Sequence, residues 1–149
     1  MNKSVSELYE QDFSLWINEN VEHLKHGDFK SCDLKNIIEE LEGMGNSQLK
    51  ELRSRLIVLL GHLLKWKFQQ EKRSGGWLGT IRENRREIEW LLIDSPSLRN
   101  RAMELVNSAR VKRDAIDIFV DDTGKDASIL NTFEWFTLEQ ILDNKFLPE

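Results

Sequence analysis

The feature that most constrains this fold is an apolar run, residues 56–64, in which His62 is the one polar side chain. In a helix built from this run, apolar side chains point in almost every direction, so other helices have to cover it on several sides. The run belongs to a longer stripe that keeps one helical phase. Its members are Leu34, Ile38, Leu41, Leu52, Leu56, Leu59 and Leu63. Gly43 and Gly45 interrupt the stripe at a cost of only about 1 kcal/mol each, so we expect one continuous or slightly kinked helix over residues 34–68.

Helical signals also fill the rest of the chain. Ser4 and Glu7 form a capping-box pattern that begins a first helix, which we expect to end at Gly27. A third helix is expected after a loop at 69–76, and a fourth from Pro96 to the Asp-Asp-Thr-Gly segment that ends at residue 124. A second capping-box pattern, at 137–140, predicts a short C-terminal helix. The side chains that we expect the first helix to bury are Leu8, Tyr9, Phe13, Trp16, Ile17, Val21 and Leu24.

These elements predict an all-α fold in a single domain, residues 1–149. The sequence contains no convincing period-two alternation and no Asn-Gly or Asp-Gly hairpin turn. We expect an irregular antiparallel bundle of four main helices, one of which is the long central helix. The aromatic segment 133–136 is expected to lie across the bundle as a clasp, followed by the short C-terminal helix.

Charge is distributed unevenly along a chain whose net charge is −5. Residues 1–51 carry five Lys/Arg and eleven Asp/Glu, residues 52–113 carry fourteen and six, and residues 114–149 carry two and nine. A basic middle segment suits binding of nucleic acid or another anion. We favour the interpretation that the basic helices lie against acidic neighbours in the bundle, because dedicated nucleic-acid-binding domains are usually basic overall.

Composition also indicates the setting of the protein. Hydrophobic residues at 40% and charged residues at 32% are typical of a soluble globular protein. Cys32 is the single cysteine and the N-terminus has no signal-peptide pattern, so we expect a reduced, cytoplasmic protein. The longest uninterrupted apolar run, residues 56–60, is far shorter than the roughly 20 residues that span a bilayer, so we expect no membrane role.

Six short motifs, spread in order over nearly the whole chain, resemble those of a known family. They are Tyr9-x-x-Asp12-Phe13-x-x-Trp16, Asn36-Ile37-Ile38-Glu39-Glu40-Leu41-Glu42, His62-Leu63-Leu64-Lys65-Trp66, Arg73-Ser74-x-x-Trp77-x-x-Thr80-Ile81, Asp94-Ser95-Pro96-Ser97-Leu98 and Thr137-Leu138-Glu139-Gln140-Ile141-Leu142. The chain resembles the uncharacterised, mainly cyanobacterial family catalogued as domain of unknown function twenty-nine. It departs from that family at Gln70, where a proline is common, and at Gly76, where a serine is common. The resemblance implies a small all-helical bacterial protein and implies no activity, substrate or partner.

A basic, tryptophan-bearing segment, residues 65–86, is the first candidate binding site. Its candidate contact residues are Lys72, Arg73, Arg82 and Arg86, and the same segment contains Trp66 and Trp77. Tryptophans between cations can stack nucleic-acid bases while the charges hold phosphates. We favour the alternative that the tryptophans anchor the core and the cations form ion pairs. Arg85 falls on the apolar face of its helix, where we expect it to need a carboxylate partner.

Glu42, Arg55 and His62 are the candidate catalytic residues, because together they could form an interhelical anion-binding or proton-transfer site. The interpretation we favour is that His62 lies at the core boundary with its ring nitrogens satisfied by a carbonyl or carboxylate. No nucleophile lies at a diagnostic spacing from it. The paired Glu-x-x-His elements of di-iron bundles are missing, and we expect no metal and no cofactor.

Trp90 and Ile93 lie on the outer side of the third helix, opposite Ile81 and Ile88. They indicate either packing beneath the C-terminal aromatic residues or a subunit contact. Since no catalytic set is readable, the sequence favours a non-enzymatic interaction or scaffold protein that binds another protein, with a homodimer as one form. The alternatives are a nucleic-acid-binding accessory protein that uses residues 65–86 and an enzyme that uses the interhelical Glu/Arg/His site.

Overall fold

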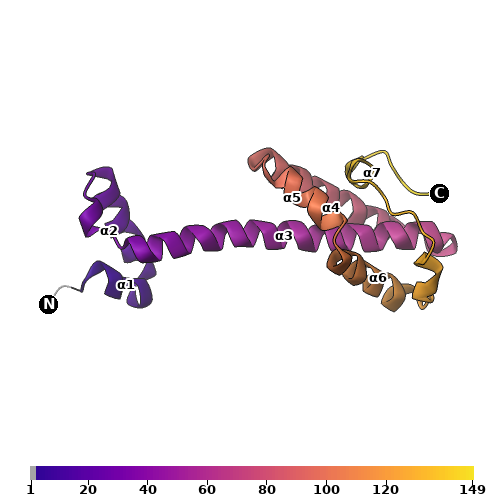
Figure 1. Ribbon diagram of the computed structural model, residues 1–149, viewed down its shortest axis with the longest axis horizontal. Helices are drawn as coiled ribbons and strands as arrows, with labels where there is room; N and C mark the ends of the chain where they lie inside the picture. The colour runs from indigo at the N-terminus through magenta and orange to yellow at the C-terminus, as the bar shows by residue number, and fades with distance from the viewer. Residues whose placement is uncertain (1–2) are drawn as a thin grey trace. The chain divides into compact units, whose positions relative to one another are not determined.

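The computed structural model describes residues 3–149, and all regular secondary structure in that range is helical (Figure 1). The α-helices are α1 (Val5–Gln11), α2 (Phe13–Lys25), α3 (Leu34–Phe68), α4 (Gly75–Asp94), α5 (Leu98–Val106), α6 (Ala109–Thr123) and α7 (Leu138–Leu142). Three 3-10 helices connect them: η1 (Phe29–Ser31), η2 (Gln70–Lys72) and η3 (Ala127–Leu130). The predicted all-α class is confirmed, and α3 has the bounds expected for the long central helix.

The chain divides into two compact units, an N-terminal unit that ends at Ser47 and a C-terminal unit, Gln48–Glu149. The boundary lies within α3, which is assigned as one uninterrupted helix through Gly43 and Gly45. Because the two glycines leave the helical hydrogen bonds intact, their effect is limited to a modest loss of helix propensity. The grouping of residues 1–149 into a single domain remains a prediction.

The N-terminal unit contains two short helices where the sequence predicted one from Ser4 to Gly27. The predicted capping box between Ser4 and Glu7 is present at the start of α1. Asp12 has an extended backbone, with φ −151° and ψ 83°, and its side chain accepts a hydrogen bond from the Leu15 N–H to cap α2. The prediction of one helix was wrong because an aspartate can end one helix and cap the next at the same position.

The C-terminal unit is built on the second half of α3, as the apolar run predicted. Leu56, Leu59 and Leu63 are fully buried there, in a core to which α4, α5, α6 and α7 contribute. Gly61 allows α6 to approach closely, since a Cβ at that position would lie 2.8 Å from Cγ2 of Ile118. The apolar run, residues 56–64, is therefore covered by other helices in this unit, as predicted.

The predicted fourth helix is also divided, into α5 and α6. Its expected start was wrong, because α5 begins at Leu98 rather than Pro96; the preceding Ser95 exchanges side-chain hydrogen bonds with Gln48. Ser108 interrupts the helix and caps α6 by accepting a hydrogen bond from the Val111 N–H. Gly124, with a φ of +70°, ends α6 in the left-handed conformation that glycine adopts most easily.

Candidate functional site

Two helical stripes of large apolar side chains are exposed in the N-terminal unit. The first lies on α2, where the members recur at spacings of four, four and three: Phe13, Ile17, Val21 and Leu24. The second lies on α3 at the same kind of spacing: Leu34, Ile38 and Leu41. Their exposed fractions range from 39% for Val21 to 61% for Leu41. We call the two stripes together the N-terminal apolar surface.

The prediction that the α2 stripe is buried was wrong, and the three α3 residues, which the sequence placed in one stripe with the buried run, are exposed as well. Leu8 and Trp16 are the buried hydrophobic residues among those described in this unit, at 7% and 4% exposure. Helical periodicity identifies the apolar side of a helix, but it does not say whether another element covers that side. On α3, Leu41 and Leu59 share one side because they lie eighteen residues, or five helical turns, apart, yet Leu59 is fully buried.

A hydrogen-bonded network, rather than a large apolar core, holds α2 against the start of α3. The Trp16 indole N–H donates to Oδ2 of Asp33 at 2.9 Å, and the backbone N–H of Asp33 donates to Oδ1 of Asn20 at 2.9 Å. The Asn36 amide donates to the same Asp33 oxygen at 2.8 Å. Burial raises the pKa of Asp33, but the hydrogen bonds from Asn36 and Trp16 outweigh it and leave this pKa below its usual value. The aspartate therefore stays ionised as the centre of the network.

Tyr9 connects α1 to α3 in the same unit. Its hydroxyl donates to Oε1 of Glu40 at 2.5 Å. This hydrogen bond, with a smaller contribution from burial and from the Glu40, Glu39 and Glu10 charges, raises the pKa of Tyr9 to about 12. Glu40 is thereby engaged within the unit, whereas Glu39 and Glu42 are exposed.

Of the three candidate catalytic residues, Arg55 lines the pocket beside the second half of α3. This open pocket has a volume of about 280 Å³, and His62 does not contribute to its lining. His62 lies 2.9 Å through Nδ1 from the Val58 carbonyl oxygen, and burial lowers its pKa, which favours a neutral ring that donates to that carbonyl. The predicted backbone partner for the His62 ring is therefore present.

Arg73, one candidate contact of the basic segment, is held within the C-terminal unit. Its Nε donates to the Trp66 carbonyl at 2.7 Å, and its terminal NH2 group donates to the Pro148 carbonyl at 3.2 Å. The guanidinium lies 4.9 Å from the centre of the Trp66 ring. One face of this tryptophan is covered by a cation and is closed to a stacked base.

The second tryptophan of the segment is covered in the same way. The Lys65 ammonium lies 4.7 Å from the centre of the Trp77 ring and donates to the Asp122 carboxylate at 2.8 Å. By contrast, Lys72, Arg82 and Arg86 are exposed, and no ion pair involves them in the described part of the chain. The segment thus combines internally held cations with three free ones.

Arg85 is buried at 3% exposure, but its expected carboxylate partner is replaced by backbone carbonyls. Its Nε donates to the Ile141 carbonyl at 2.8 Å, and its terminal NH2 group donates to the Gln140 carbonyl at 3.3 Å. Burial lowers the pKa of Arg85, while the nearby Asp143 charge opposes that shift. The arginine attaches α7 to α4 by donating to the Ile141 carbonyl and to the Gln140 carbonyl, which also accepts a hydrogen bond from the Asp143 N–H.

Trp90 and Ile93 are exposed on α4, at 58% and 61%. The C-terminal aromatic residues therefore do not bury them. This leaves the subunit or partner contact as the remaining sequence-based interpretation of the pair.

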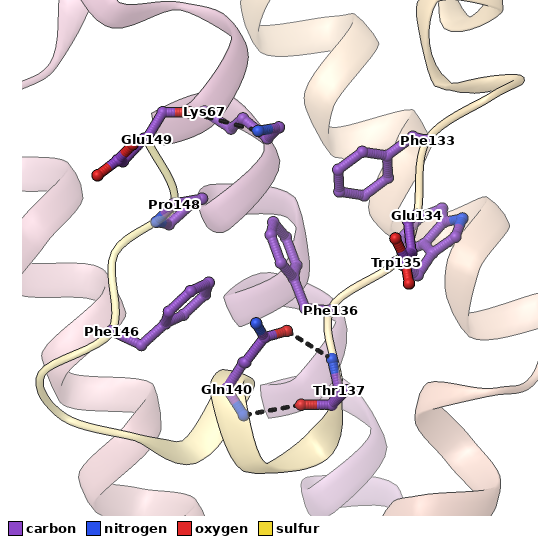
Figure 2. Close-up of a pocket in the computed structure, with 10 residues that line it drawn as sticks. All are labelled: Lys67, Phe133, Glu134, Trp135, Phe136, Thr137, Gln140, Phe146, Pro148 and Glu149. Carbon is purple, nitrogen blue, oxygen red and sulfur yellow. Dashed lines mark hydrogen bonds between the residues drawn. The ribbon is translucent and has the colours of Figure 1, made fainter.

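The C-terminal aromatic segment forms the predicted clasp and encloses a pocket of about 340 Å³ (Figure 2). Phe133 packs edge to face against both Trp135 and Phe136, with ring centres 5.6 Å and 5.2 Å apart, and Phe136 packs likewise against Phe146 at 5.7 Å. Above the rings, the Lys67 ammonium donates to the Glu149 carbonyl at 3.4 Å. The sequence indicated this aromatic clasp but gave no signal for the pocket.

Residues 3–149 contain neither a candidate metal site nor a helix that could span a membrane. No three His, Cys, Asp or Glu side chains in this range are grouped so that they could hold one metal ion. Within the same residues, no helix has both the length and the apolar character needed to cross a membrane.

Comparison with known proteins identifies a family but no characterised relative. No curated protein and no solved structure matches the chain. A family model described as a domain of unknown function, DUF29, matches residues 8–147, which is nearly the full length. The protein therefore belongs to the DUF29 family.

Proposed function

We propose that this protein is a non-enzymatic interaction protein and that the N-terminal apolar surface is its binding site. The observation that carries the proposal is that seven large apolar side chains, at regular helical spacing, are exposed on one 47-residue unit. Monomeric proteins rarely expose large contiguous apolar patches, and such patches mark sites where another molecule binds. The family assignment is consistent with this role and assigns no activity of its own.

The free energy gained by covering the N-terminal apolar surface can be estimated from its side chains. Covering a half-exposed Leu, Ile, Val or Phe contributes about 1 kcal/mol, so the α2 stripe contributes on the order of 4 kcal/mol and the α3 stripe on the order of 3 kcal/mol. The entropy lost on association costs roughly 4–15 kcal/mol. The apolar surface alone therefore supports weak binding, and polar contacts around it have to supply the rest of the affinity and the specificity.

Trp90 and Ile93 are proposed as a second contact of the same kind on the C-terminal unit. Their exposure supports this proposal, and a partner or a second copy of the chain could cover them. The lone Cys32, a free thiol, supports a reducing, cytoplasmic setting for this binding.

The proposal is tested by affinity capture from the native host with the full-length protein and two variants. The double variant Ile38→Gln and Leu41→Gln makes the α3 stripe polar without adding charge. The control is Ser47→Gln, an exposed residue nine positions after Ile38 and therefore on the opposite side of α3. A protein that is recovered by the wild type and the control, is lost with the double variant, and binds again after purification supports the proposal. Equal recovery by all three proteins would reject the surface as the binding site.

Nucleic-acid binding is the second candidate function, favoured by the exposed and unpaired Lys72, Arg82 and Arg86 described above. Their replacement by glutamine should abolish salt-dependent binding of DNA or RNA if this function is correct. Unchanged binding, or none in the wild type at low salt, would exclude it. The covered faces of Trp66 and Trp77 make this function second to protein binding.

A further inference from the structure

Given the interaction role proposed above, on which this step rests, we infer that the N-terminal apolar surface binds a cationic amphipathic helix. The two stripes have the spacing that helices use to pack against one another. The apolar residues recur at i, i+4 and i+7 on α3, and at i, i+4, i+8 and i+11 on α2. A partner helix with apolar side chains at matching intervals can pack on either stripe.

The negative charge of the N-terminal unit favours a partner helix of positive charge. Residues 1–47 contain four Lys/Arg against ten Asp/Glu, a net charge of −6, although the whole chain carries only −5. The acidic excess of the protein is therefore concentrated on the unit that carries the exposed apolar surface. A cationic partner gains from this field both in its rate of association and in its specificity.

Carboxylates border the α3 stripe itself. Glu42 is four residues after Ile38, one turn further along the helix at the edge of the stripe, and Glu39 lies beyond it on the same flank. Both side chains are exposed and form no ion pair among the described residues. Lys35 is the one basic residue on this part of α3. Lysine or arginine side chains that flank the apolar face of a partner helix would pair with these glutamates.

A second copy of the chain fits the same surface less well. Packing two such surfaces together would place two units of net charge −6 in contact. The Debye length at physiological ionic strength is about 8 Å, so charges at the rim of an interface repel one another with little screening. The charge distribution therefore favours a partner of opposite sign over self-association.

The test uses the full-length protein and two designed helical peptides. Both peptides carry leucine at i, i+3, i+4 and i+7 spacing; the remaining positions are lysine in one peptide and glutamate in the other. Binding is measured by fluorescence anisotropy near physiological salt. We expect the lysine peptide to bind at least about tenfold more tightly than the glutamate peptide. Ile38→Gln with Leu41→Gln should weaken its binding about tenfold, and Ser47→Gln should leave it within twofold.

A second pair of variants isolates the charge at the rim. Glu39→Gln with Glu42→Gln should weaken binding of the lysine peptide about fivefold, as expected for the loss of two partly exposed ion pairs. Glu10→Gln with Glu19→Gln makes the same change in net charge away from the α3 stripe and should have less than a twofold effect. Equal losses from the two pairs would mean that the peptide senses only net charge, which would overturn the assignment of the surface.

The outcomes separate this inference from the proposed function. If both peptides bind equally and both are lost with the Ile38/Leu41 variant, the partner is not selected by charge; the inference fails and the binding surface stands. If neither peptide binds and sedimentation shows a dimer that the same variant dissociates, the occupant is a second copy, and the inference again fails. If neither peptide binds and the protein is monomeric, the inference fails, and the capture experiment alone decides the proposed function.

Discussion

Replacing Gly61 by alanine should destabilise the C-terminal unit, although alanine is the better helix former. A Cβ at residue 61 would lie 2.8 Å from Cγ2 and 3.0 Å from Cβ of Ile118, and 3.4 Å from the Ala115 carbonyl oxygen. The Cβ of Ile118 is attached directly to the backbone of α6, so a change of rotamer cannot move it away. Relief requires α3 and α6 to separate, and overpacking of this kind costs typically about 1–3 kcal/mol.

The opposing term is the gain in helix propensity, about 1 kcal/mol when alanine replaces glycine in a helix. We expect overpacking to exceed it, for a net loss of up to about 2 kcal/mol and a fall in Tm of up to roughly 6 °C for a chain of this size. Gly79→Ala is the matched control, because a Cβ at this position in α4 meets nothing within 4 Å. That variant should gain about 0.5–1 kcal/mol.

The assay is urea denaturation of both variants and the wild type, followed by circular dichroism. The close approach of α6 to α3 predicts that the two substitutions change stability in opposite directions. An increase in stability for Gly61→Ala equal to that for Gly79→Ala would refute the reasoning, because it would show that a methyl group fits between the helices without strain.

Three further predictions follow from single contacts. Arg85→Met should lower the free energy of unfolding by about 1–2 kcal/mol in urea denaturation, because it leaves the Ile141 carbonyl without its donor, while the exposed Arg86→Met should change it by less than about 0.5 kcal/mol. Tyr9 is the single tyrosine, so the absorbance of tyrosinate should report its pKa of about 12 directly, and Glu40→Gln should return that pKa toward 10. Since the folded pKa of Tyr9 is raised, the stability from this contact should be complete below pH 10 and be lost as the pH rises to about 12. His62 has a lowered pKa, so the free energy of unfolding should fall as the pH drops below 6.5. In urea denaturation, the fall should be shallower for His62→Gln, which would show that His62 contributes to this pH dependence.

The sequence predicted the parts of the fold that depend on local hydrogen bonding or on an apolar pattern that only one arrangement satisfies. The run at 56–64 has apolar side chains all around, and only burial on several sides satisfies such a helix. The capping boxes at Ser4 and Thr137 are local hydrogen-bond patterns, and both are present. The long helix across Gly43 and Gly45 was predicted because the apolar phase continued through the glycines.

The N-terminal unit could not be predicted in the same way. Its stripes at Ile17 and Ile38 have the periodicity of a core, but a periodic pattern is equally suited to contact with another helix of the chain or of a partner. The break at Asp12 had a local signal, since aspartate is a preferred N-cap, but an aspartate on the polar side of a continuous helix gives the same sequence.

The candidate site residues show the same limit. The position of Arg85 on an apolar face indicated burial correctly, and the side chain is 3% exposed. Its partners are two carbonyl groups at the end of a helix about 55 residues away in the sequence, and no residue type marks a carbonyl as a partner. Contacts of this kind depend on the packing of distant helices and are visible only in the structure.

The central claim is that one apolar stripe of α3 is open in the N-terminal unit and buried in the C-terminal unit. Thiol labelling tests it at two positions that share a side of the helix, with Leu41→Cys and Leu59→Cys each made in a Cys32→Ser background. Leu41 is 61% exposed and Leu59 is fully buried. We predict that the thiol at 41 reacts at nearly the rate of a free thiol, and that the thiol at 59 reacts at least about a thousandfold more slowly because it requires unfolding. Strong protection at 41, or equal rates at the two positions, would contradict the account.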